Sequence, residues 1–580
     1  MGSVRCSDEY ADPVVGVKPI AGHTCERVVG SWACPASACR TAPPVRHIVT
    51  FRRSSGVDLS SLSYEQANSL ISGTGSVVER LDPAVMALIA IDTPVTAYLR
   101  SVIADDYPQH IVLSGNAGDG KTFLAVTLHG MLPPDAWEVV TDASEEDVEL
   151  LGPRLTRALE HGKRIFMAIN RGKLERLHDW VRASPDDAGP LARLVDAVEH
   201  GLRLRVAWDG ELDLLGEVAT VDLGVFDSLA DEVIDGVLDR LVEVQPPPGQ
   251  GARAAFDRAQ ATLRDSAVRN RIKEVLRAVQ ASGRHVTMRQ LWQGLTTLLT
   301  GSRRAGDADD VRIEDSVGAR LFPDGDSAPL LALAREAMDP SVVPQPGLTR
   351  IALRETMGSH LDPLPGLRGL GFGEACSPTV VRAAWLHGSG EAAPPEPVRS
   401  RFGVIAGRLA APAPEGWQED ADLVEDVLNG VYDALGLWRG SDGYYAWERL
   451  CYDSRLMDRA GALASGLIDV DRLRVALPRP NPRAQQALKG AYRPPYLLLG
   501  DPDAAPGDAL HIGSAMLERL LAPAAGRGEP LIPADEEILR RWLARLPRRG
   551  EKRFAVRRPG EPPAFLNRTA TGLKISGVAR

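Results

Sequence analysis

The 580-residue chain contains little lysine, few cysteines and few aromatic residues, and it has no long apolar run. Only eight of its 67 basic residues are lysines, so arginine supplies nearly all of the positive charge. No stretch reaches the ~18 uninterrupted apolar residues of a membrane-spanning helix, and no apolar run of a secretory signal follows the first residues. A net charge of −10 excludes a general polyanion binder, so nucleic-acid contact would require a local basic patch. We therefore expect a cytoplasmic protein without a membrane contact.

Four of the six cysteines lie within the first 40 residues, namely Cys6, Cys25, Cys34 and Cys39. Together with His23 they offer sulfur and nitrogen ligands for zinc, but their spacing is irregular and no Cys-x-x-Cys pair is present. Residues 1–50 are rich in proline, cysteine and glycine without periodicity, which favours a disordered leader. A zinc site in this leader is the alternative.

An apolar content of 44% supports a sizeable core, and ~100–200 residues per domain suggests three or four domains. Short apolar strands, expected at 111–113, 137–141, 164–169 and 218–223, alternate with helices. This alternation predicts an α/β core with a parallel sheet and helices on both faces.

The remaining regions are expected to be mostly helical. In the lead-in, apolar spacing of three and four over 85–103 predicts a helix. The expected order is a disordered leader (1–50), a helical lead-in (51–104), the α/β core (105–230), a helical lid (231–305), a helical domain (306–440) and a helical, basic C-terminal domain (441–580).

One segment matches G-x-x-x-x-G-K-[ST] at every fixed position, between a predicted strand and an amphipathic helix. Its glycines let the backbone curl, so that N–H groups and the helix dipole hold phosphates. Lys121 is expected to reach the β- and γ-phosphates, and the Thr122 hydroxyl to ligate Mg²⁺. The segment predicts binding of ATP with Mg²⁺. The expected nucleotide-binding residues are Gly115, Asn116, Ala117, Gly118, Asp119, Gly120, Lys121, Thr122 and Phe123.

An ATPase of this kind also needs a carboxylate at the end of a neighbouring strand, to hold Mg²⁺ and orient the attacking water. Asp142 and Asp222 both end predicted strands, and the Mg²⁺ role is left open between them, with a helix cap or turn as the alternative for each. Neither is followed directly by a glutamate. Asn170 ends a third strand and is expected to position water, because an amide cannot take up a proton.

Arg289 stands at the start of a predicted helix that Thr287 would cap, so it is a candidate to reach the γ-phosphate from the lid. A solvated helix arginine is the alternative. Arg264, Arg269 and Arg271 are candidates to act on a neighbouring subunit of a homo-oligomer, and the sequence does not choose among them.

Two arginine-rich segments, 472–493 and 540–558, stand out in the acidic chain. Arginines with interleaved aromatic residues suit contact with a phosphate backbone, which makes DNA a candidate partner. A solvated face or a protein-docking site is the alternative.

The glycine-rich string, Asp142-Ala-Ser-Glu145 and the segment from Ala168 through Asn170 to Leu174 together resemble one bacterial family. These are the P-loop ATPase components of DNA-restriction and phage-defence systems, notably those of the phosphorothioation-dependent DptF type. Arg171 departs from the acidic residue expected after the asparagine. The resemblance implies an AAA-like core, partner subunits in a multi-subunit defence complex and action on foreign DNA.

The leading hypothesis is an ATPase that drives or gates such a complex. The alternative is a slow or non-hydrolysing ATP-dependent switch or scaffold, favoured by the missing Asp-Glu pair. A phosphotransferase is a third hypothesis, but the chain lacks a signature for binding a phosphate acceptor.

Overall fold

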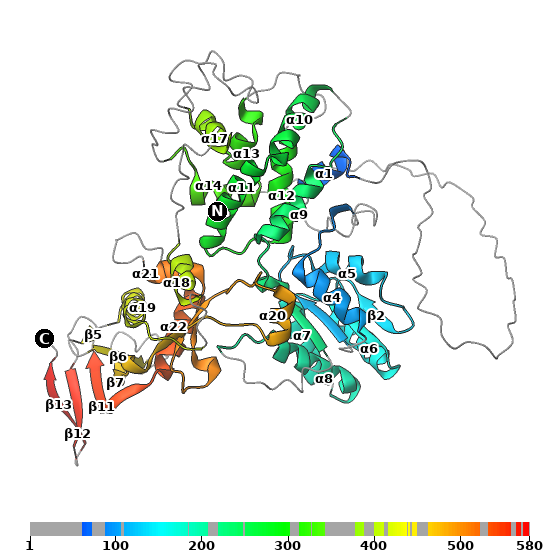
Figure 1. The fold of residues 1–580 in the computed structure, drawn as a ribbon. Helices are drawn as coiled ribbons and strands as arrows, with labels where there is room; N and C mark the ends of the chain where they lie inside the picture. Colours follow the sequence, from blue (N-terminus) through cyan, green and yellow to red (C-terminus); the bar gives the residue numbers. More distant parts are fainter. Residues whose placement is uncertain are drawn as a thin grey trace, which may run out of the picture. The chain divides into compact units, whose positions relative to one another are not determined.

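Four short strands form one parallel sheet in the order β2-β3-β1-β4. Strand β2 of this sheet is labelled in Figure 1. The bounds of the four strands are β1 His110–Ser114, β2 Trp137–Val140, β3 Arg164–Ala168 and β4 Val218–Asp222. The expected strands and their parallel pairing are confirmed to within one or two residues. Parallel registers align the carboxyl ends of β1, β3 and β4, with Leu113 beside Ala168 and Ser114 beside Asp222.

The computed structural model describes residues 61–71, 88–105, 110–183, 185–206, 218–247, 250–301, 313–325, 327–342, 377–387, 400–410, 416–437, 439–440, 443–448, 462–521, 532–557, 564–569 and 572–578. The leader with its candidate zinc ligands His23, Cys25, Cys34 and Cys39 lies outside these residues. Among the residues that are described, no helix is long and apolar enough to span a membrane.

Side chains of successive strand residues enter different apolar clusters, as the period of two in a β-strand requires. Ile111 and Leu113 join a cluster with α4 (Pro94–Ala104) and α5 (Lys121–His129). Val112 joins the cluster that contains α6 (Val148–Glu160), α7 (Arg171–Ala183) and α8 (Pro185–Leu202). The sheet therefore carries helices on both faces, which explains why its strands are largely apolar.

The helix expected over 85–103 is interrupted. Residues 90–93 are irregular, and α4 begins only at Pro94, with Thr93 as its N-cap accepting the Thr96 N–H at 3.2 Å. Proline fixes φ and lacks an N–H, so it suits the first turn and ends any helix running into it. The apolar periodicity correctly predicted the buried face of α4, but it placed the start of the helix too early in the chain.

Helices follow the sheet, as expected. They are α9 (Asp231–Leu241), α10 (Gln250–Arg264), α11 (Ser266–Ala281), α12 (Met288–Thr300), α13 (Val317–Leu321), α14 (Pro329–Met338) and α17 (Pro378–His387). The amino-terminal helix α1 (Tyr64–Ile71) packs against α12. Apolar residues of these helices belong to the same cluster as Ile111 and Leu113, so one core continues from the sheet into the helices.

The expectation of a helical C-terminal region is wrong for much of 439–578. The helices α18 (Arg401–Ala410) and α19 (Ala421–Ala434) precede this region. Residues 439–578 contain the helices α20 (Pro482–Leu488), α21 (Ser514–Leu521) and α22 (Pro533–Arg545), but also two antiparallel sheets. The smaller is β10 (Leu510–Ile512), β9 (Leu497–Gly500) and β8 (Arg474–Ala476). The larger has the order β13 (Gly572–Val578), β12 (Ala564–Thr569), β11 (Arg548–Arg557), β7 (Ala462–Ile468), β6 (Gly443–Glu448) and β5 (Arg439–Gly440).

The short apolar run of β9 shows why the smaller antiparallel sheet was not predicted from the sequence. Four residues are too few to show a helical period, and such runs form strands when turn residues flank them, here Pro495 before and Asp501-Pro502 after. All four residues of this strand are buried.

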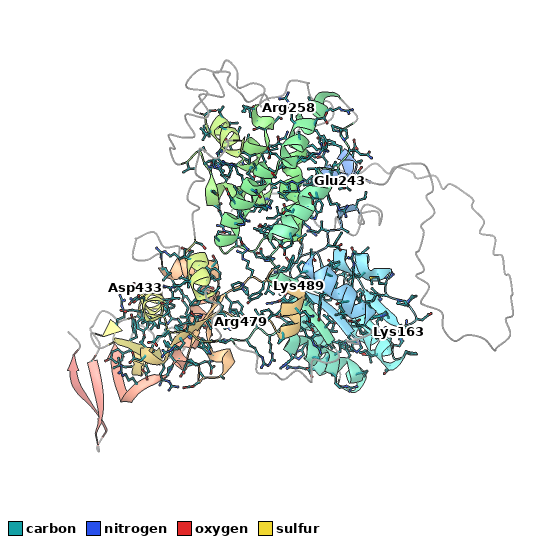
Figure 2. The ribbon with its side chains drawn as sticks, viewed as in Figure 1. Lys163, Glu243, Arg258, Asp433, Arg479 and Lys489 are labelled. Carbon is teal, nitrogen blue, oxygen red and sulfur yellow. The ribbon has the colours of Figure 1, made fainter. Side chains whose placement is uncertain are left out.

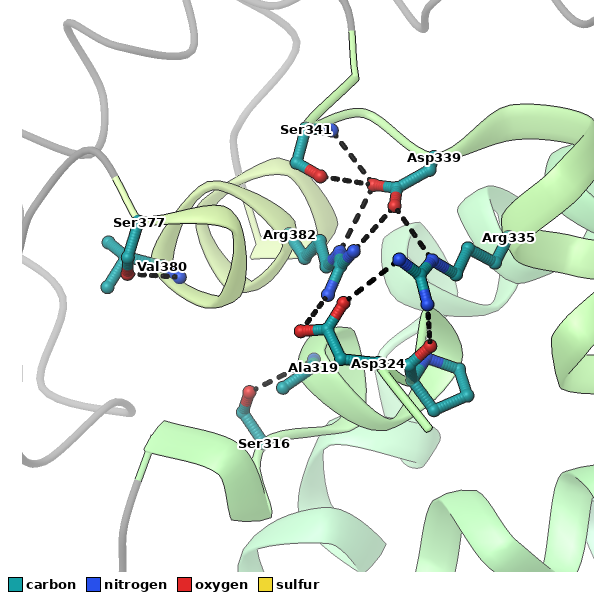
Figure 3. Close-up of polar contacts among 10 residues, drawn as sticks. Ser316, Ala319, Asp324, Arg335, Asp339, Ser341, Ser377, Val380 and Arg382 are labelled. Carbon is teal, nitrogen blue, oxygen red and sulfur yellow. Dashed lines mark hydrogen bonds and ion pairs between the residues drawn. The ribbon is translucent and has the colours of Figure 1, made fainter. Parts of the chain in front are cut away.

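A buried ion-pair network joins α14 and α17 (Figure 3). The guanidinium of Arg382 donates to both carboxylate oxygens of Asp339, at 3.1 and 2.6 Å, and pairs with Asp324 at 2.9 Å. Burial acts to raise the pKa of Asp339, but hydrogen bonds from Arg382 and Ser341 outweigh it and hold this pKa below its usual value. The stabilisation from this carboxylate is therefore present above pH ~3.9 and is lost as pH falls through the lower folded pKa.

We expect Arg382→Ala to destabilise the helical region by about 3–5 kcal/mol, because it removes the buried guanidinium that donates two hydrogen bonds to the buried Asp339 carboxylate. Asp339 has only 1% of its side chain exposed, so water cannot replace the arginine. Arg335→Ala is the matched control, since Arg335 pairs with the same two carboxylates but is 43% exposed. Its cost should be about 0–1 kcal/mol. Thermal unfolding of the two variants measures the difference, and equal losses would contradict the burial argument.

Candidate functional site

The loop between β1 and α5 contains three glycines with positive φ. Gly115, Gly118 and Gly120 have φ values of 147°, 91° and 94°, a region that glycine adopts at little cost. Gly120 is the N-cap residue of α5, and Lys121 is the first residue of that helix. The predicted motif therefore adopts the strand–loop–helix arrangement that its sequence requires.

Lys121 is buried, and its side chain folds back over the loop. Its ammonium donates to the carbonyl oxygens of Gly115, at 3.1 Å, and Asn116, at 2.7 Å. Burial lowers the pKa of Lys121, and the nearby carboxylates of Asp119, Asp142 and Asp222 oppose that shift. A cation in this position is balanced by surrounding carboxylates and peptide oxygens.

Asp142 lies beside Thr122. The Thr122 hydroxyl donates to one Asp142 carboxylate oxygen at 3.1 Å, and the Ser144 N–H donates to the other at 2.9 Å. A hydroxyl and a carboxylate oxygen this close match the hard ligands that Mg²⁺ uses, with water and substrate oxygens completing its shell. No group of three or more His, Cys, Asp or Glu ligands occurs among the described residues.

Asp222, the other candidate, has different partners. One of its carboxylate oxygens pairs with Arg171, and the other accepts the Gly224 N–H at 2.9 Å as the cap of a short 3₁₀ turn. Asp222 ends β4, which pairs directly with β1, whereas Asp142 follows β2, which β3 separates from β1. The geometry favours Asp142 for the metal and assigns Asp222 to the Arg171 pair.

Asn170 and Arg289 both line the cavity beside the loop. The Asn170 side-chain oxygen accepts the Lys173 N–H at 2.8 Å at the start of α7, which leaves its amide N–H₂ as a donor. Arg289 follows Thr287, and Thr287 forms the capping box of α12 with Gln290 as expected. The Arg289 backbone N–H donates to Gly118 O at 3.1 Å.

The other candidate arginines have partners elsewhere. Arg264 donates to Val242 O at 2.9 Å, Arg269 pairs with Asp239 at 2.5 Å, and the Arg271 guanidinium lies over the Trp385 ring. None of them lines the cavity.

The cavity has a volume of about 370 Å³ and is lined by both polar and apolar residues. Its polar lining includes residues 117–122 of the glycine-rich loop with Asp142, Ser144, Glu145, Asn170 and Arg289. Its apolar lining comes from Leu70, Ile89, Ile91, Val95, Phe123, Leu124, Leu223, Phe226, Met288 and Trp292. Ligand sites of ~300–1,000 Å³ with apolar walls and few convergent polar groups are typical of small-molecule binding. Residues Ala117 to Phe123 of the expected loop all line it.

Sequence reasoning missed Glu145 as a site residue. Glu145 lines the cavity and is exposed, and no bonding partner is found for it among the described residues. The other carboxylates of the lining, Asp119 and Asp142, are both held by hydrogen bonds. The signal was present as Asp142-Ala-Ser-Glu145, but a search for a glutamate directly after the aspartate passes over it.

Many arginines of the two basic segments are paired with acids. Arg472 contacts Asp501 at 2.7 Å, Arg541 contacts Glu537 at 2.8 Å, and Arg545 contacts Asp508 at 3.0 Å. Side chains from 550 to 558 lie outside the described part of the chain. Direct DNA contact stays a prediction.

Comparison with known proteins gives no relative: no family model, no curated protein and no solved structure matches the chain.

We expect Gly118→Ala to disturb the loop more than Gly120→Ala. Both substitutions force a side chain into a left-handed conformation, which costs ~1–2 kcal/mol. At Gly118 a new Cβ would also lie 3.1 Å from the Thr287 hydroxyl, whereas at Gly120 the nearest atom is 3.7 Å away, in Met288. The midpoint of thermal unfolding should therefore fall further for Gly118→Ala, and the reverse order would contradict the packing of α12 on the loop.

Proposed function

We propose that the chain binds ATP with Mg²⁺ in this cavity and hydrolyses it, as the ATPase subunit of a cytoplasmic DNA-restriction or anti-phage complex. The observation that carries the ATP part is the convergence of Lys121, Thr122 and Asp142 at the mouth of a loop with three left-handed glycines. The assignment to a defence complex is supported only by the resemblance of the loop, the Asp142–Glu145 string and the Asn170 segment.

The polar residues of the lining suit a triphosphate. Phosphate would bind the backbone N–H groups at the start of α5, where the helix dipole favours negative charge. Lys121 is already buried there, and it can exchange its contacts with Gly115 O and Asn116 O for phosphate oxygens. Thr122 and Asp142 would hold Mg²⁺, which supplies neutralisation of charge on the phosphate oxygens. The apolar walls around Phe226 and Trp292 suit a purine base.

Hydrolysis requires a group that accepts a proton from water. Glu145 is the carboxylate of the lining that is exposed and without a hydrogen bond among the described residues, so it is the best-placed general base. Glu145 takes the proton as the water oxygen bonds to the γ-phosphorus and the bond to the ADP oxygen breaks. Asn170 orients the water with its amide, and Arg289 offers positive charge to the γ-phosphate.

A slow switch or scaffold is the second candidate. It is favoured by the separation of Asp142 and Glu145 by two residues, which differs from an adjacent Asp-Glu pair. In that case ATP binds with similar affinity but turns over slowly.

Lys121→Ala should weaken ATP binding at least ~10-fold, because a buried ammonium that pairs with phosphate contributes a charge-assisted hydrogen bond. Lys163→Ala is the matched control. Lys163, labelled in Figure 2, lies at the amino end of β3, opposite the carboxyl ends of the strands, and contacts Pro134 O at 3.0 Å. Calorimetric titration of both variants with ATP and Mg²⁺ measures the effect. If Lys121→Ala binds ATP with the affinity of the wild type, ATP does not bind at this loop as proposed.

Glu145→Gln should lower the turnover rate about 10²–10⁴-fold, the usual contribution of a general base, while ATP binding is retained. Glu149→Gln on α6 is the control, since Glu149 is an exposed glutamate that does not line the cavity. Phosphate release measured with and without DNA separates the hypotheses. Wild-type binding without turnover supports the switch, and full turnover in Glu145→Gln would exclude Glu145 as the base.

A further inference from the structure

Asp119 occupies a variable position of the glycine-rich motif, but its side chain is almost fully buried, with 2% exposed. One carboxylate oxygen accepts the Asn116 N–H at 2.6 Å, within the loop. The other lies 2.8 Å from Nε2 of His285, which is 166 residues further along the chain. A carboxylate oxygen accepts, so the His285 ring nitrogen donates in this contact.

His285 belongs to the short connection between α11 and α12, and this connection is fixed against the loop at several points. Val286 O accepts the buried Ser228 hydroxyl at 2.5 Å. The Arg289 N–H donates to Gly118 O at 3.1 Å, and Thr287 fills the space where Gly118 lacks a Cβ. The α11–α12 connection and the start of α12 therefore contact the glycine-rich loop, and Arg289 of α12 lines the cavity.

We propose that His285 is a positioning residue for the nucleotide-binding loop, and that the His285–Asp119 pair couples nucleotide binding to α11 and α12. The inference rests on the proposed function. His285 fixes the Asp119 carboxylate, and Asp119 fixes the N–H of Asn116, whose carbonyl oxygen contacts Lys121. Without the imidazole, a buried carboxylate oxygen loses its partner, and the loop must shift to expose it to water.

The coupling acts in both directions, as thermodynamic linkage requires. A movement of α11 and α12 would change the contact between His285 and Asp119, and through Asp119 the conformation of the glycine-rich loop. A triphosphate that orders the loop in turn favours the position of α12 in which Arg289 enters the cavity. Through the His285–Asp119 pair, the helical region contacts the nucleotide-binding loop directly, without itself contacting the nucleotide.

The test is calorimetric titration of the full-length chain with ATPγS and Mg²⁺. His285→Ala and Asp119→Ala should each weaken binding roughly 10-fold, a size common for coupled sites, and the double variant should be no weaker than the weaker single variant. His285→Gln should restore most of the affinity, because its amide N–H can reach the same carboxylate. A merely structural loss would not be rescued in this way. His129→Ala, at the exposed end of α5, is the control.

Lys121→Ala separates the two proposals. If it binds ATPγS like the wild type, the proposed function fails. If it loses binding while His285→Ala retains wild-type affinity, or if the losses in the double variant add, the positioning role fails alone. Unfolding temperatures accompany each titration. Should His285→Ala unfold at the assay temperature, His285→Gln decides, and weakening of that folded variant to the level of Asp119→Ala would overturn the role of the imidazole.

Discussion

The parallel register of β1 with its two neighbours is the constraint on which the candidate site depends. Because parallel strands end at the same edge, the residues that follow β1, β3 and β2 come together there although they lie far apart in the chain. Short apolar strands buried on both faces fix that register, since a shift by one residue would turn apolar side chains to the wrong cluster. Packing that has no chemical role thus sets the distance between Thr122 and Asp142.

Charge balance is the second condition of the site. Lys121 is an ammonium removed from most water, and the peptide oxygens and three carboxylates around it make its burial tolerable. The same arrangement keeps the position available to an anion, because peptide oxygens are weaker partners for an ammonium than phosphate oxygens are. Asp222 contributes to this balance while it is held by Arg171, so the carboxylate nearest in strand order to the loop is not the one that faces Thr122.

The sequence predicted the features that depend on local pattern. The four strands, the left-handed glycines and the cap at Thr287 follow from periodicity and turn chemistry over a few residues. The choice between Asp142 and Asp222 depends on which carboxylate faces Thr122 in the folded chain, and residue patterns along the chain do not specify that contact. Glu145 and His285 were missed because their roles come from contacts in space. The smaller antiparallel sheet was not predicted because its strands β8, β9 and β10, of three or four residues each, are too short to show a period.

One contact far from the cavity bears on how the chain can be divided. Strand β4 is one of the two edge strands of the parallel sheet, and α20 packs against it. Asn481 donates to Gly201 O at 2.6 Å, and Tyr492 forms a β-bridge with Phe226, while Arg479 and Lys489, labelled in Figure 2, bracket the helix. An uncovered edge strand invites pairing with other chains. A fragment that ends after the helical region would lack this cover. The parallel sheet is contiguous in sequence with its own helices, but its β4 edge is covered by residues about 280 positions further along the chain.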